Sequence, residues 1–212
     1  MSDEEFELQT QVLNHNEKNI DTHVRHRVYV DFIRDKNLKE SLKPLYATSA
    51  FIMVSLEDNE AYYNVREPSE VQLGAHCLPG QVAPAGEVSI LQDNYGRSFS
   101  GHWVVKPGRE VQRTLTTNYT YLPFDTTIHF IAVHLHPFAE KLELIDLNTE
   151  EVVWQAKAKA PEGGRIGLAH VDHYSSKEGL QLYQDHDYEM LATIITHQVL
   201  IKMRWPQCLF MH

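Results

Sequence analysis

The feature that most constrains this chain is a series of short, apolar and alternating segments that runs through most of its 212 residues. Residues 127–136 and 188–195 are two examples, and both are rich in β-branched and other apolar side chains. Turn formers such as Pro107-Gly108 and Gly163-Gly164 stand between such segments. Short strands at this spacing favour an antiparallel sandwich over an α/β fold. We therefore predict a mainly β protein, an antiparallel β-sandwich or jelly roll.

The segments expected to form strands share a run of apolar or alternating residues bounded by turn signals. They are residues 22–33, 45–56, 99–105, 111–117, 127–136, 142–146, 152–156, 166–171 and 188–195, with a further strand starting at Val88. The segment 45–56 is the most uniformly apolar and is expected to be a central strand. Only residues 34–43 and a short stretch at 176–180 have a helix-like pattern. The Pro and Gly residues of 66–86 predict a long loop.

The length of the chain predicts one large domain or two small ones, and these elements favour one domain with a segment at each end. Residues 1–21 are charged and lack apolar periodicity, so we expect a flexible lead-in. Residues 22–195 are expected to form a jelly-roll β-sandwich. A hydrophobic content of 42% is enough for a substantial core in a chain of this length. Residues 196–212 form an atypical tail.

Charge and composition argue against several classes of function. The chain has 29 acidic and 19 basic residues, a formal charge of −10, which would repel a phosphate backbone, so we do not expect a nucleic-acid partner. No apolar stretch is long enough to span a membrane as a helix, and the acidic N-terminus does not resemble a signal peptide. Cys77 and Cys208 allow at most one disulfide, so the core must hold the fold together.

The segment His134-Leu135-His136 carries the strongest chemical signal among 13 histidines. In a strand, residues two apart point to the same face, so His134 and His136 can bring two imidazoles onto one ion. The pair follows the apolar run 128–133 and is ended by Pro137, which places it where a coordination position can face solvent. Imidazole suits copper, zinc, iron and nickel, and affinity favours copper. The alternative is a pair of strand histidines that simply face water.

The other histidines give weaker signals. His76 and His102 offer further ligands, but their spacing does not show that they meet the pair. His170 and His173 have opposite strand parity, so they can share an ion only if the strand has ended and the chain has turned. We expect four more to be surface or hydrogen-bonded structural residues: His23, His26, His129 and His186.

The residues around the pair resemble a known family, the copper type II, ascorbate-dependent monooxygenases. The resemblance covers residues 85–195 and is carried by Trp103-Val104-Val105-Lys106-Pro107-Gly108-Arg109, by Ile128-His129-Phe130-Ile131-Ala132-Val133-His134-Leu135-His136, by Leu142-Glu143-Leu144 and by Asp187-Tyr188-Glu189-Met190-Leu191. These segments are similar to the C-terminal domain of peptidylglycine α-hydroxylating and dopamine β-monooxygenases.

The resemblance implies a jelly-roll domain in which His134 and His136 bind copper where oxygen is activated. In the family, a methionine on a later strand supplies the third ligand, and a separate domain holds a second copper. This chain is too short for both domains, so a catalytic role would need a second copper domain or an electron donor from elsewhere. The substrate is unknown. The resemblance also implies export to the periplasm or the extracellular space.

The tail after Ile195 departs from the family, which has an acidic loop and a methionine-bearing strand there. Reading the codons from their third base permits such a segment, because the genetic code then allows an acidic loop followed by an alternating strand with a methionine. We hypothesise that the reading frame shifts near Ile195. In that case this polypeptide lacks the family's final strand and third ligand, and Met203 is a candidate substitute with neighbours unlike those of the family site. The alternative is a genuinely divergent tail.

Two other functions compete with a copper site. The first is a non-metal β-sandwich that binds a protein or a sugar, for which exposed tyrosines would be suited: Tyr62, Tyr63, Tyr119 and Tyr121. The second is a zinc hydrolase, which needs a third strong ligand and a general base that the sequence does not reveal. No nucleophile elbow, phosphate loop or Cys-x-x-Cys motif is present.

Overall fold

The structure is a computed structural model, and it describes residues 23, 25–56, 90–92, 96–118, 120, 122–196, 201–204 and 207–211. The chain divides into two units, Met1–Leu45 and Tyr46–His212. Among the described residues the helices are single short turns, and none could cross a membrane.

The described part of the first unit is an extended chain with one short helix. The 3-10 turn η1 (Asp35–Asn37) is its one regular element, and residues 25–34 have no strand partner among the described residues. Nearly every side chain of the segment is exposed. The predicted strand over residues 22–33 and the predicted helix over 34–43 are therefore wrong for the described residues. Neither segment has a sheet or a core of its own to bury its apolar side chains.

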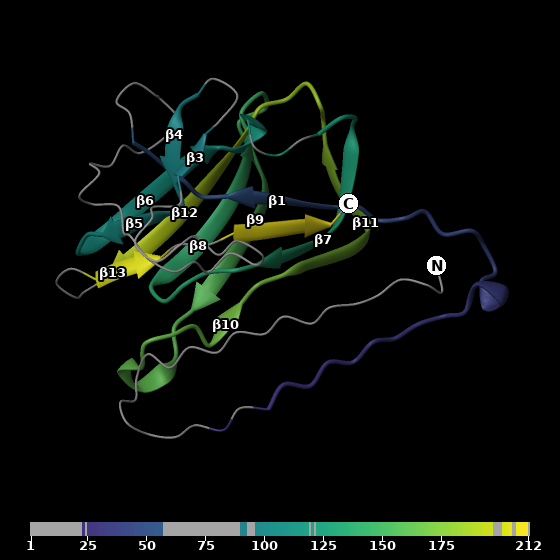
Figure 1. Ribbon diagram of the computed structural model, residues 1–212, viewed down its shortest axis with the longest axis horizontal. Coiled ribbons are helices and arrows are strands. Elements are labelled where there is room, and N and C mark those ends of the chain that lie inside the picture. The colour runs from purple at the N-terminus through teal and green to yellow at the C-terminus, as the bar shows by residue number, and fades with distance from the viewer. Residues whose placement is uncertain are drawn as a thin grey trace. The chain divides into compact units, whose positions relative to one another are not determined.

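Two antiparallel sheets form most of the second unit (Figure 1). Their strands are β1 (Ala47–Phe51), β6 (Gly108–Leu115), β7 (Thr126–Val133), β8 (Ala139–Asp146), β9 (Glu151–Lys159), β10 (His170–Val171), β11 (Tyr174–Leu182), β12 (Tyr188–Thr196) and β14 (Gln207–Met211). One sheet has the order β1-β14-β7-β11, and the other has the order β10-β9-β8-β12-β6.

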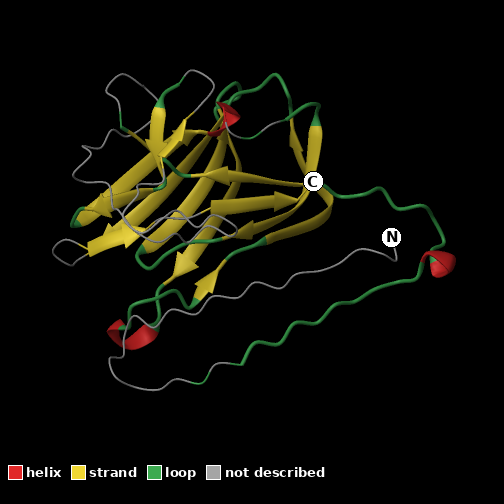
Figure 2. Ribbon diagram, viewed as in Figure 1, coloured by secondary structure: helices red, strands yellow, loops and turns green. Residues whose placement is uncertain are grey.

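Smaller sheets and helical turns complete the unit (Figure 2). Strands β2 (Val54–Ser55), β3 (Ile90–Gln92) and β4 (Ser98–Ser100) form one small sheet in the order β2-β4-β3. Strands β5 (His102–Val105) and β13 (Ile201–Arg204) form another. The 3-10 turns η3 (Thr116–Asn118) and η4 (Glu162–Gly164) lie in connections. The prediction of a mainly β, antiparallel sandwich is confirmed.

Apolar side chains from both large sheets meet in one core. Strand β8 alternates, with Leu142 and Leu144 buried and their neighbours more exposed, which is the period of a half-buried strand. Strand β7 contributes Ile128 and Ile131, and β12 is buried along almost its whole length. A second, smaller cluster contains Met53 and Phe99.

Four other predicted elements need correction. The segment 45–56 divides into β1 and β2, each at the edge of its sheet rather than in a centre. Residues 176–180 belong to strand β11 rather than to a helix, and the pairing with β7 is irregular between Ser175 and Leu180. The predicted strand 166–171 shortens to β10, and the strand expected over 127–136 ends at Val133. The predicted loop at 66–86 and the strand start at Val88 lie outside the described residues.

Candidate metal centre

The pair His134 and His136 lies in the short connection between β7 and β8. Strand β7 is an inner strand with β14 and β11 on either side, so the point where it ends is held by two neighbours. Between the two histidines, Leu135 packs against the core. Because successive residues of an extended chain point in opposite directions, this contact helps to direct both rings away from the core. The local chain therefore still presents the pair together, although the strand has ended.

The two imidazole rings face each other at chelating distance. The Nε2 atoms of His134 and His136 are 3.1 Å apart, and the ring centroids are 5.2 Å apart with a tilt of 41°. For metal–nitrogen bonds of about 2.0–2.1 Å, this separation corresponds to an angle of about 100° at the ion. That angle suits both tetrahedral and distorted square-planar coordination. The same distance also fits a single N–H···N hydrogen bond, which requires the accepting ring to be neutral.

Desolvation favours the neutral form of His134. The residue has an exposed side, yet surrounding atoms desolvate its ring, and this lowers its pKa from the ordinary value of 6.5. A histidine must be deprotonated at the ligating nitrogen before it can bind a metal. The site therefore holds at least one imidazole in the form that a metal requires at neutral pH.

A strained turn leads from His136 into β8. The Ala139 N–H donates to the His136 carbonyl at 3.2 Å, with Pro137 and Phe138 as the central residues. Phe138 has a φ of 75°, which a type II turn requires at this position and which normally favours glycine. Its side chain packs against the core, and its carbonyl accepts a hydrogen bond of 2.9 Å from the Ile195 N–H. Packing and this bond offset about 1–3 kcal/mol of backbone strain beside the histidines.

The described residues supply two ligands and no third. No group of three or more His, Cys, Asp or Glu side chains that could hold a metal occurs among them. Met53 and Met190 are buried in the two core clusters. Met203 lies on β13, which pairs with β5 in a sheet separate from that of β7. A third ligand would have to come from residues outside the described ranges or from another molecule.

The tail takes a place in the large sheet directly beside the candidate site. Strand β14 inserts between β1 and β7, and Cys208 pairs with Val133, the residue before His134. The last strand next to the pair is therefore supplied by the chain as it stands. The frameshift near Ile195 stays a hypothesis.

Three other histidines have hydrogen-bond partners of their own, apart from the pair. His170 contacts Asp172 at 3.0 Å, and His173 is exposed. His129 Nδ1 lies 3.1 Å from the Ser176 carbonyl oxygen, and His186 Nδ1 lies 2.6 Å from Asp146. The structural roles predicted for His129 and His186 are confirmed.

The described residues do not include several positions named from the sequence. His76 lies outside the described residues, as does the side chain of His102. The tyrosines suggested for a binding surface, at 62, 63, 119 and 121, also lie outside them. In the first unit, His23 and His26 are exposed, as expected.

The sequence analysis missed a second cluster, built around the carboxylate of Asp146. One oxygen of this buried side chain accepts hydrogen bonds from the N–H groups of Asn148 and Thr149 at 2.9 and 3.2 Å. The other oxygen faces His186. Burial raises the pKa of Asp146, but these bonds outweigh it and the net shift is downward. The hydrogen bond to Asp146 raises the pKa of His186.

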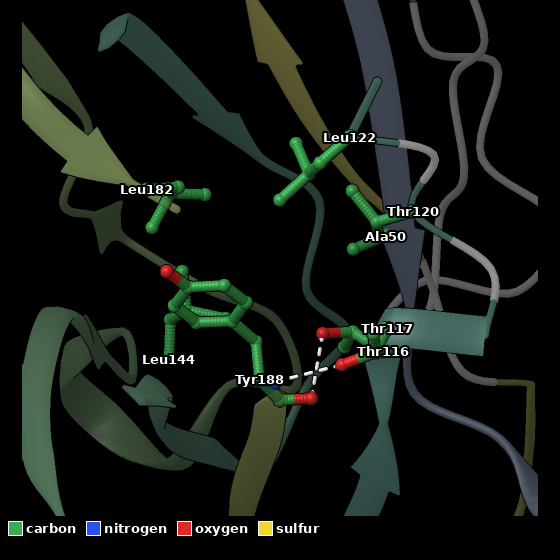
Figure 3. A pocket seen from close by; sticks show the side chains of 8 residues that line it. All are labelled: Ala50, Thr116, Thr117, Thr120, Leu122, Leu144, Leu182 and Tyr188. Atoms are coloured by element: carbon green, nitrogen blue, oxygen red, sulfur yellow. Dashed lines mark hydrogen bonds between the residues drawn. The ribbon is translucent and has the colours of Figure 1, made fainter. Parts of the chain in front are cut away.

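Tyr188 connects this cluster to a small pocket at the same end of the sandwich (Figure 3). Its hydroxyl accepts a 2.8 Å hydrogen bond from the Tyr183 N–H, and its backbone is held by Thr116 and Thr117. The remaining lining residues are mostly apolar: Ala50, Thr120, Leu122, Leu144 and Leu182. The Asx-turn pattern Asp146-x-Asn148-Thr149 was the one sequence signal for this cluster, whereas its partner 40 residues away left none.

The comparisons give no relative from which a function could be transferred. No family model, no curated protein and no solved structure matches the chain.

Proposed function

We propose that this chain contains a copper-binding β-sandwich domain in which His134 and His136 are two ligands of one copper ion. The observation that carries the proposal is the 3.1 Å separation of their Nε2 atoms. Both nitrogens can then bind the same ion without a change of backbone. The resemblance to the jelly-roll domain of the copper type II monooxygenases also supports the proposal. It would explain why the two histidines stand together at the end of an inner strand.

The surroundings of the pair suit a soft or borderline cation with nitrogen ligands. Copper exceeds the other divalent first-row ions in affinity for such sites. Desolvation keeps His134 neutral, and the Pro137–Phe138 turn and the core contact of Leu135 fix the chain on either side of His136. When bound, copper would supply one-electron redox chemistry. The residues of this chain would hold it and leave coordination positions open.

Catalysis requires more than the described residues contain. Two imidazoles leave the ion short of a third protein ligand, and no group here identifies an electron donor or a substrate. We propose that a catalytic role, if the domain has one, depends on a second copper domain or an electron donor supplied by another chain. Export to an oxidising compartment remains a prediction from the resemblance.

A non-metal binding domain is the competing function. It is favoured by the absence of a third ligand among the described residues and by the fact that a hydrogen bond also explains the His134–His136 contact. In that case the sandwich would serve as an interaction scaffold, and the pair would only close the end of β7.

Copper titration of the full chain separates the two functions. We expect one tightly bound copper per chain, with an electron paramagnetic resonance spectrum that reports nitrogen ligands. The variants His134→Ala and His136→Ala should each lose tight binding. His173→Ala is the matched control, because it removes an exposed histidine that is not part of the pair. Equal copper binding by the chain and by the two pair variants would refute the copper site and favour the interaction scaffold.

A further inference from the structure

Residues 25–33 form an exposed apolar segment without a partner in the described structure. Five large hydrophobic side chains follow one another there with at least 55% of their surface exposed: Val28, Tyr29, Val30, Phe32 and Ile33. A folded chain rarely leaves so many neighbouring apolar side chains in water unless another surface covers them. The exposure therefore indicates a binding segment.

The sequence of this segment has the character of a β-strand. Val28, Val30 and Phe32 alternate with other residues and would share one side of an extended chain. β-Branched and aromatic residues such as these favour strands. The backbone is already extended in the structure, without a helix or turn over residues 25–34. What the segment lacks is a neighbouring strand to pair with.

The distribution of charge along the chain indicates which surface could provide a neighbouring strand. Residues 23–45 contain six basic and three acidic side chains, whereas residues 46–212 contain 20 acidic and 12 basic ones. The basic residues nearest the apolar run stand at both of its ends: Arg25, Arg27, Arg34 and Lys36. A segment of this kind is attracted to an acidic surface. The second unit of another copy of the chain is such a surface.

Strand β11 is the sheet edge that fits best. In the described part of the chain it pairs with β7 alone, so its other side forms the edge of the four-stranded sheet. It spans nine residues, the length of the segment 25–33, with an irregularity between Ser175 and Leu180. Acidic residues flank both of its ends, with Asp172 before it and Asp185 after it. Another edge strand, β6, instead carries the exposed basic residues Arg109 and Arg113, of which Arg113 is ion-paired with Glu189.

We propose that residues 25–33 of one chain pair as a β-strand with the edge of β11 in a second copy of the chain. Backbone hydrogen bonds would supply the pairing, and the alternate side chains Val28, Val30 and Phe32 would cover the adjoining surface. Reciprocal exchange between two copies gives a closed, symmetric dimer. The proposal does not depend on copper binding.

Analytical ultracentrifugation of the full chain tests the proposal, with two variants. Val30→Asp should raise the dimer dissociation constant by about tenfold or more, because it places a charge in the centre of the buried face. Leu42→Asp is the matched control, since Val30 and Leu42 are both 68% exposed but Leu42 lies outside the segment. Added salt should weaken the dimer as well. Both sites are exposed, so neither variant should unfold the sandwich.

Hydrogen exchange then locates the contact. On dimerisation, we expect slower exchange of the amides of residues 25–33 and of β11. A chain that stays monomeric at high micromolar concentration would overturn the proposal. So would a dimer that Val30→Asp and Leu42→Asp weaken equally, or one that protects β6 rather than β11. Protection of residues 25–33 in a monomer would show that the strand pairs within its own chain, which also contradicts the proposal.

Discussion

At one end of β7, the chain leaves the sheet through His134 and His136, whereas at the other end the loop that carries His186 approaches the start of the strand. The contact at that second end is a 3.1 Å hydrogen bond from the Gln184 N–H to Asp125, the residue before β7. His186 faces a buried carboxylate that also holds two backbone N–H groups. His134 faces another imidazole. The two ends thus place the same side chain opposite partners of different charge.

This difference decides what each histidine can do. The carboxylate of Asp146 raises the pKa of His186 and favours its charged form, which cannot accept a metal at the protonated nitrogens. Desolvation lowers the pKa of His134 and favours its neutral form. A count of histidines does not separate the two cases. Their partners do: a carboxylate makes a structural ion pair, and a second imidazole makes a candidate metal site.

The largest effect is expected from removing the carboxylate at the His186 end. Asp146→Ala should lower the free energy of unfolding by about 2–4 kcal/mol, because the Asn148 and Thr149 N–H groups and His186 lose their acceptor. Chemical denaturation measures this change. Asp185→Ala, which removes an exposed carboxylate from the neighbouring loop, should cost less than about 0.5 kcal/mol. Similar losses in both variants would mean that Asp146 does not hold this end together.

A substitution in β11, opposite Thr127 and Ile128 of β7, should also lower the free energy of unfolding. Gly179 in β11 has a φ of 76°, and a Cβ there would lie 2.3 Å from Thr127 Cγ2 and 2.9 Å from the Ile128 carbonyl oxygen on β7. Gly179→Ala should therefore cost about 2–4 kcal/mol in unfolding free energy. Gly163→Ala has a similar φ of 73° but nothing within 4 Å, so it should cost only about 1 kcal/mol. Equal costs would contradict the close approach of β11 to β7.

At the His134 end, a smaller change should affect both the stability of the fold and copper binding. Pro137→Ala frees the first central residue of the turn after His136 and should lower the unfolding free energy by about 0.4–1 kcal/mol. It should also weaken copper binding, because His136 is held less firmly. Pro123→Ala is the control, since this exposed proline precedes the opposite end of β7. Isothermal titration should find its copper affinity unchanged, and an equal loss in both variants would argue against a positioning turn.

The smallest effects concern pH, and the two ends should respond with opposite sign. The pKa of His186 is raised in the folded protein. Its contribution to the free energy of unfolding is therefore present below the ordinary pKa of 6.5 and is lost as the pH rises through the folded pKa. The pKa of His134 is lowered in the folded protein. Its contribution to the free energy of unfolding is therefore present above pH 6.5 and is lost as the pH falls through the folded pKa. Denaturation of His186→Gln and His134→Gln across this range checks both. Parallel pH profiles for the two variants would remove the contrast between the ends.

The sequence by itself determined the class of fold and the place of the candidate site. In segments such as 142–146, apolar and polar residues alternate. This local pattern predicts a strand with one face buried against a core. The pair His134 and His136 is recognisable for the same reason, because its members are neighbours along the chain. Their rings meet even though β7 ends at Val133 rather than at His136.

Only the tertiary structure decided the features that depend on partners distant in sequence. His186 meets Asp146 across 40 residues, and neither residue type predicts the other. Residues 176–180 have a helix-like pattern but lie in β11, which pairs with β7 on either side of an irregularity there. Residues 25–33 have a strand-like pattern but lack a described partner. A strand exists only where a second strand satisfies its backbone groups, and no local sequence encodes where that second strand lies.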